Sequence, residues 1–192
     1  MQSQREMLAR AALETMLEKG VANTSNRDIC ARAGVTIGAL YTHFKTREEL
    51  ILAAGMLGSM FEYEPVETWA GYEAWVRAVM RPLATDPRHF QLARMSYEFV
   101  AELVLTDTRL PAAEAEWDNL YAFFRASLAA MHRAGEIDLP LGLEATMRVH
   151  TQILSGAHYM LLADRRLDVV EVCEGLMPAL ALAAGWSGRS VP

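Results

Sequence analysis

The segment between residues 24 and 50 constrains the fold of this chain more than any other, because its capping signals place two short helices side by side. Ser25 is followed three residues later by Asp28, which is the spacing of a capping box at a helix start. Gly34 stands where a left-handed residue would end that helix. Thr36 can then cap a second short helix. The segment therefore predicts two short helices joined by a tight turn.

A pair of helices joined in this way is a helix-turn-helix, whose second helix enters the major groove of DNA. That helix is expected over residues 36–43. Ile37, Gly38 and Ala39 at its start are small or apolar, so the backbone can approach the bases and methyl groups can contact thymine. The polar side chains expected to reach phosphates or base edges are Tyr41, Thr42 and His43. For the tyrosine and the histidine, packing against the next helix is the alternative interpretation.

Three cationic side chains flank the second helix. Arg27, on the preceding helix, is a long forked donor and the best candidate for reading guanine. Lys45 and Arg47 follow the helix and are sited for phosphate contacts. Thr46 and Glu49 form a second capping box, which predicts that a new helix opens at Arg47.

Several groups of residues between Arg5 and Leu50 occur together in one known kind of DNA-binding domain. They are Ala11-Ala12, Gly20, Thr24-Ser25, Arg27-Asp28-Ile29, Ala33-Gly34-Val35, Leu40-Tyr41-Thr42-His43-Phe44-Lys45 and Glu49-Leu50. With this combination the region resembles the DNA-binding domain of the TetR family of transcriptional regulators. The resemblance implies DNA contacts at Arg27, Thr36, Gly38, Ala39, Tyr41, Thr42, His43 and Lys45; Ser25, Ile37 and Arg47 complete the candidate DNA-binding residues.

Two residues depart from the pattern of that family. Asn26 stands where the family usually has an apolar residue or threonine, and Ile37 fills a position that is often polar. The base preference is therefore not carried over, whereas the docking mode is.

The remainder of the chain predicts an all-α fold of about nine helices, because no period-two strand pattern occurs in it. The expected helices are 4–19, the two of the motif, 47–63, 72–84, 87–105, 111–134, 141–164 and 168–184, the last of which Pro178 should kink or limit. The expected domains are a helix-turn-helix domain over 1–46 and an effector-binding and dimerisation domain over 47–192. The helix that opens at Arg47 joins the two, and its apolar face includes Met60 and Phe61.

Charge and cysteine content bound the remaining functions. Residues 1–50 hold seven Lys/Arg and six Asp/Glu, a net charge of +1, and the other 142 residues hold eleven and eighteen, a net charge of −7. An acidic body would repel phosphate and orient the molecule on DNA, although solubility explains the acidity equally well. Cys30 and Cys173 indicate buried thiols in a reducing compartment, not a disulfide. With no secretory or membrane-spanning stretch, a cytoplasmic protein is expected.

No motif for catalysis, for a metal or for a cofactor is found, so neither an enzyme nor a metalloprotein is expected. Ser127 and Ser155 lie within expected helices without a paired base. The predicted body is rich in methionine and aromatic side chains, which suit a cavity for a hydrophobic small molecule, although ordinary core is the favoured interpretation of each one singly. The candidate ligand-binding residues are Met95, Phe99, Trp117, Tyr121, His150, Leu154 and His158. Either histidine can instead be a structural residue with both ring nitrogens hydrogen-bonded.

The last two expected helices have the composition of an assembly surface. The candidate dimerisation residues are Ile153, Gly156, Ala157, Met160, Val169, Cys173, Leu176 and Leu180. The resemblance implies a homodimer held by a four-helix bundle of these helices, a repressor of a pseudo-palindromic operator, and release by a small hydrophobic effector. A DNA-binding protein without an effector, which acts through a protein partner or as an architectural protein, is the alternative.

Overall fold

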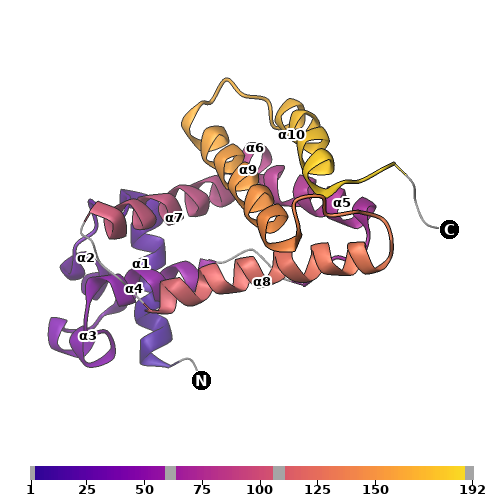
Figure 1. Cartoon of the computed structure of the whole chain (residues 1–192). Coiled ribbons are helices and arrows are strands. Elements are labelled where there is room, and N and C mark those ends of the chain that lie inside the picture. Colours follow the sequence, from indigo (N-terminus) through magenta and orange to yellow (C-terminus); the bar gives the residue numbers. More distant parts are fainter. Residues whose placement is uncertain (1–2, 59–63, 106–110, 189–192) are drawn as a thin grey trace. The chain divides into compact units, whose positions relative to one another are not determined.

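The computed structural model describes residues 3–58, 64–105 and 111–188, and the regular structure in these ranges is helical (Figure 1). Ten helices lie there: α1 Gln4–Lys19, α2 Asn26–Ala33, α3 Ile37–His43, α4 Arg47–Gly58, α5 Trp69–Met80, α6 Pro82–Thr85, α7 Pro87–Leu105, α8 Pro111–Arg133, α9 Leu143–Ala163 and α10 Val169–Ala184. An isolated antiparallel bridge joins Ile137 to Trp186. The predicted all-α fold is confirmed.

The predicted helix bounds agree with the structure where a cap or a proline marks the end. The ranges of α1 and α7 were both predicted from such signals. The helix predicted over 72–84 is instead two helices, because Pro82 has no N–H with which to continue the backbone ladder of α5. Pro178 does not end α10, which continues to Ala184. The predicted last residues of α4, including Met60 and Phe61, lie outside the described residues.

The chain divides into two compact units. The head unit comprises residues 1–60 and 91–114, and the body unit comprises residues 61–90 and 115–192. The head unit is larger than the domain predicted over 1–46, because it also takes in α4 and the part of α7 that begins at Gln91.

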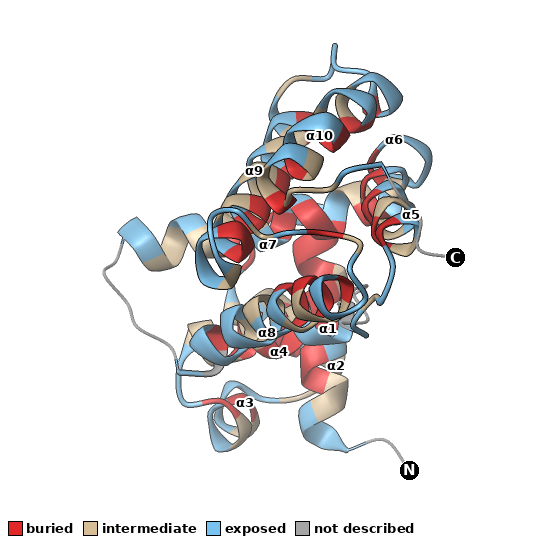
Figure 2. Cartoon of the chain, turned by 45° about the vertical axis from the view of Figure 1, so that its right-hand side comes forward, coloured by how far each residue is buried: buried red, intermediate tan, exposed pale blue. Residues whose placement is uncertain are grey.

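The core of the head unit is one hydrophobic cluster built from α1, α2, α3, α4 and α7 (Figure 2). The stripe of Leu8, Ala12 and Met16 on α1 is 0–1% exposed. Met95 and Phe99 on α7 belong to the same cluster. The sequence predicted these two residues at an effector site in the body, whereas the structure places both in the core of the head unit. A local sequence pattern does not show that α7, which follows residues of the body unit in the chain, packs in the core of the head unit.

A polar clamp joins α4 and α7 to the loop between α1 and α2. The Arg47 guanidinium donates hydrogen bonds to the carbonyl oxygens of Val21 at 2.6 Å and Thr24 at 2.8 Å. Its Nε lies 3.7 Å from a carboxylate oxygen of Glu102. The Glu98 carboxylate accepts a hydrogen bond from the Val21 N–H at 2.9 Å. The side chain predicted to bind phosphate is thus directed inward, and its guanidinium is engaged within the head unit.

The core of the body unit is aromatic. It gathers Trp69, Tyr72, Trp75, Phe123, Phe124 and Trp186, with ring centroids of neighbouring members 4.5–6.4 Å apart. The Nε2–H of His150 donates to the Leu180 carbonyl at 3.0 Å, because a carbonyl can only accept. Nδ1 therefore accepts from the Tyr72 hydroxyl at 2.8 Å. Burial lowers the pKa of His150 to about 4 and keeps the ring neutral. Of the two roles left open for His150, the structure gives it the structural one.

Replacement of Arg47 by methionine should destabilise the head unit by about 2 kcal/mol, because two backbone carbonyls and a carboxylate lose a charged donor. Chemical denaturation at fixed protein concentration measures the change. Arg32→Met is the matched control, since Arg32 pairs with Glu18 on the surface of the same unit, and its loss should be below about 1 kcal/mol. Equal losses in the two variants would contradict an internal role for Arg47.

Candidate nucleic-acid interface

The helix-turn-helix is formed by α2 and α3, and its caps are those predicted. The Ser25 side chain accepts from the Asp28 N–H at 3.2 Å while the Asp28 carboxylate accepts from the Ser25 N–H at 2.9 Å. Gly34 ends α2 in the left-handed conformation, with φ 69° and ψ 30°, where a side chain would be strained. Thr36 caps α3 by accepting from the Ala39 N–H at 3.2 Å. These local bonds set the turn between the helices.

One face of α3 is anchored in the head core and the opposite face is open (Figure 2). Leu40 is 1% exposed and Phe44 is fully buried. Ile37 and Tyr41 are 37% and 48% exposed, which leaves two large apolar surfaces of a seven-residue helix in contact with solvent. The further exposed residues on or next to this face are Thr36, Gly38, Thr42 and Lys45. The arrangement matches a helix that is held from behind and presented to a groove.

The polar side chains of this surface differ in the hydrogen-bonding groups that remain available to an outside partner. The Thr42 hydroxyl donates to the Gly38 carbonyl at 3.0 Å, so its oxygen remains as an acceptor. The half-buried His43 has its Nε2 3.2 Å from the Gln4 Oε1, which packs it against α1 and not outward. Lys45 is exposed, with its ammonium 3.4 Å from the Tyr41 carbonyl.

Arg27 is exposed on α2, where the sequence placed it as a base-reading donor. Ser25 is exposed too, and its hydroxyl lies 2.5 Å from the Asp28 carboxylate that completes the capping box. The Arg5 guanidinium lies 4.7 Å from the centroid of the Phe44 ring, a cation–π contact that links the start of α1 to the end of α3.

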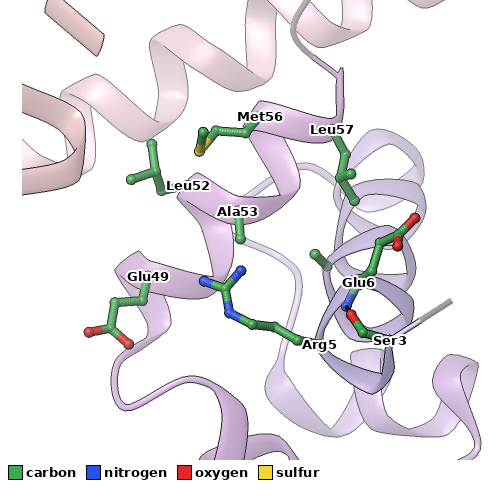
Figure 3. A pocket seen from close by; sticks show the side chains of 9 residues that line it. Ser3, Arg5, Glu6, Glu49, Leu52, Ala53, Met56 and Leu57 are labelled. Carbon is green, nitrogen blue, oxygen red and sulfur yellow. Dashed lines mark hydrogen bonds between the residues drawn. The ribbon is translucent and has the colours of Figure 1, made fainter. Parts of the chain in front are cut away.

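A groove of about 300 Å³ opens on the head unit between α1 and α4 (Figure 3). Its walls include Arg5 and Glu6 from α1 and Leu52, Met56 and Leu57 from α4. None of the predicted ligand-binding residues lines it. The predicted ligand set does not gather in one place, because Met95 and Phe99 belong to the head unit whereas the other five belong to the body unit.

The five predicted ligand residues of the body unit have different surroundings. Trp117 is 42% exposed, Tyr121 is half-buried, and Leu154 is buried. His158 is also buried, and burial, with a smaller contribution from His89, lowers its pKa to about 4. Among the described residues, no group of three or more His, Cys, Asp or Glu side chains could hold a metal ion. In the same ranges no helix has the length and apolar character needed to cross a bilayer.

The predicted dimerisation residues divide between two faces. Val169, Cys173 and Leu180 are buried inside the body unit, where α10 packs against α9 and α5, so they cannot form a surface. Gly156 and Met160 on α9 are exposed, and Ile153, Ala157 and Leu176 are half-buried. The sequence missed the open face of α10, whose exposed residues are Val170, Glu171, Glu174, Gly175, Pro178, Ala179 and Leu182. Because apolar residues of α10 occur on both faces and Glu171 and Glu174 are its only charged residues, its pattern did not show which face lies inward.

Comparison with known proteins agrees with this geometry. Residues 8–54 match a family model described as bacterial regulatory proteins, tetR family. The transcriptional regulator SrpR of Pseudomonas putida is 26% identical over 183 residues, which cover 92% of this chain and 84% of SrpR. The transcriptional repressor BepR of Brucella suis biovar 1 (strain 1330) is 26% identical over 166 residues, or 79% of this chain and 77% of BepR.

Two solved structures share the fold over nearly the full chain. SmeT, described as the repressor of the Stenotrophomonas maltophilia multidrug efflux pump SmeDEF, has a TM-score of 0.71 at 24% identity, with 100% of this chain and 95% of SmeT covered. NalD, described as a secondary repressor of a multidrug efflux pump in Pseudomonas aeruginosa, also has a TM-score of 0.71, at 18% identity, with 97% and 98% covered. These likenesses show that the head and the helical body both have the fold of such proteins.

The carboxylate of Asp28 ties α2 to α1. It accepts from the Lys19 ammonium at 2.6 Å as well as from Ser25, and these hydrogen bonds hold the Asp28 pKa well below its usual range. A carboxyl with a lowered pKa contributes its full stability above its ordinary pKa of about 3.9, and this contribution is lost progressively as the pH falls from there towards the lowered pKa of the folded protein.

Asp28→Asn should therefore unfold at a lower temperature than the wild type at pH 7, and the difference should shrink as the pH falls below about 4. Thermal melts of the two proteins between pH 7 and pH 3 measure it. A difference that does not change with pH would show that the charge of Asp28 is not what stabilises α2.

Proposed function

We propose a specific role for this chain, which belongs to the TetR family of helix-turn-helix transcriptional regulators: it is a homodimeric repressor of a pseudo-palindromic operator, released by a small, largely hydrophobic effector. The DNA-binding part of the proposal is supported chiefly by which residues of α3 are buried and which are exposed. Leu40 of α3 and Phe44, which follows its last residue, are buried, while its Thr36-capped start and its Tyr41 face are open to solvent.

The side chains of the open face divide into two roles. Arg27 is the donor that discriminates bases, because a guanidinium can bond guanine with two parallel hydrogen bonds. Gly38 and Ala39 keep the backbone near the bases, and the methyl groups of Ile37 contact thymine. Lys45 and the Tyr41 hydroxyl bind phosphates, which fixes the register but carries no sequence information.

The open faces of α9 and α10 support the homodimer. Gly156 and Gly175 leave the two helices without side chains at points where a second copy can approach closely, and Leu182 is 81% exposed beside Ala179. A two-fold axis is the commonest way for a monomer to cover such a surface. Two copies of α3 would then reach successive major grooves, whose half-sites lie roughly 34–36 Å apart.

BepR, a relative that covers most of this chain, is described as a repressor, which supports repression over activation. The effector part of the proposal is supported by the aromatic and methionine content of the body unit. A regulator without an effector is the second candidate, favoured by the filled aromatic core around Tyr72 and Phe124, which are 0% and 2% exposed. Saturable binding of the amphiphilic dye 1-anilinonaphthalene-8-sulfonate, with release of operator DNA, would favour an effector site. The absence of such binding would favour the second candidate.

Arg27→Ala and Lys45→Ala should weaken DNA binding in different ways. The arginine variant should lose about 1–3 kcal/mol on the preferred sequence and relax the base preference. The lysine variant should weaken binding to all sequences alike and reduce the salt slope by about 1, because one phosphate is no longer neutralised. Operator and scrambled duplexes titrated at several salt concentrations measure both effects. These two roles would be refuted by equal changes in base preference.

Leu182→Glu should convert the dimer into a monomer, because it places one carboxylate from each copy in the proposed interface, and operator affinity should fall with dimerisation. Sedimentation velocity at micromolar concentration measures the assembly state. Leu141→Glu is the matched control: Leu141 is 55% exposed in the same unit but lies outside α9 and α10. A wild-type monomer, or a Leu182→Glu dimer, would contradict this interface.

A further inference from the structure

Asn26 connects the two helices of the motif through a side chain that is imperfectly satisfied. It is the first residue of α2, and its Nδ2 donates a hydrogen bond to the Tyr41 hydroxyl on α3 at 3.3 Å. Its Oδ1 is buried and has no hydrogen-bond partner among the residues that the structure describes. A buried acceptor without a donor loses its bonds to water and gains nothing in return, so it destabilises the folded protein.

The direction of this hydrogen bond decides what Tyr41 can do. A phenol has one proton to donate and an oxygen that can accept. Because the oxygen accepts from the Asn26 amide, the hydroxyl proton stays available for a partner outside the protein. Tyr41 is 48% exposed, so such a partner can reach it. A phosphate oxygen is an ionised acceptor, and hydrogen bonds to it are shorter and stronger than those between neutral groups.

The amide also prepares the hydroxyl in two further ways. Donation into the phenol oxygen polarises the O–H bond and makes it a better donor, as in other hydrogen-bond chains. It also restricts the ring, whose exposed end would otherwise lose rotational freedom on binding DNA. Nearby polar groups do not replace it: Lys45 contacts the Tyr41 backbone carbonyl and not the ring hydroxyl.

We propose that Asn26 is a positioning residue for DNA binding: it holds the Tyr41 side chain so that the phenol proton is directed at a backbone phosphate of the operator. This inference rests on the proposed function. An apolar side chain at position 26 would remove the unpartnered oxygen, so Asn26 lowers the stability of the fold relative to such a residue. Residues that break a local rule in this way are expected at functional surfaces.

The test is a double-mutant cycle of Asn26→Val and Tyr41→Phe, measured on operator DNA and by thermal unfolding. Asn26→Val should weaken operator binding roughly 3- to 10-fold, the loss of one or two hydrogen bonds, while the melting temperature stays the same or rises. In the Tyr41→Phe background, which has no hydroxyl to position, Asn26→Val should have no further effect on affinity.

Asn23→Val is the matched control. The Asn23 amide donates to the Lys19 carbonyl at 3.1 Å in the same unit and does not contact Tyr41, so operator affinity should stay within about twofold of the wild type. The inference is overturned if Asn26→Val leaves affinity unchanged, if it lowers affinity and melting temperature together, or if its effect persists without the Tyr41 hydroxyl. A wild-type protein that binds no duplex overturns the proposed function itself, and the inference with it.

Discussion

The burial of Leu40 and Phe44 is the interaction on which the rest of the head unit depends. A helix of seven residues is not stable alone in water, since its few hydrogen bonds do not offset the ordering of its backbone. The Thr36 cap satisfies one N–H at the start of α3, but position and orientation come from the two anchored side chains. The packing of Leu40 and Phe44 in the core therefore determines where the outward residues of α3 lie.

The wall that receives those anchors is assembled from distant parts of the chain. α1 and α4 supply most of it, and α7 adds Met95 and Phe99. The Arg47 clamp fixes the loop that leads from α1 into α2. The start of the motif is thus held by the Arg47 side chain, and its end is held by the buried Phe44. The head unit that presents α3 therefore extends well beyond the helix-turn-helix of α2 and α3.

Local chemistry made the motif predictable, and distant contacts made its surroundings unpredictable. Ser25, Gly34 and Thr36 act within four residues of themselves, so their roles can be read from spacing. Arg47 bonds carbonyls 23 and 26 residues away and pairs with Glu102, and nothing in its neighbourhood distinguishes this from a phosphate contact. The two faces of α10 pose the same difficulty, because hydrophobicity marks both and only packing decides which is inside.

The inward Arg47 changes how the head would hold DNA. Arg10, Lys19 and Arg32 are paired with carboxylates of the same unit, so their charges are already partly offset. Arg27 and Lys45 remain as exposed cations next to α3, and Arg5, which is also exposed, lies over the Phe44 ring. Affinity that rests on few cations must draw more on neutral donors, such as helix N–H groups and hydroxyls, whose bonds to phosphate release no counterions. A donor such as the Tyr41 hydroxyl is then worth more to this surface than to a strongly basic one, and a residue that aims it can be retained even where it weakens the fold.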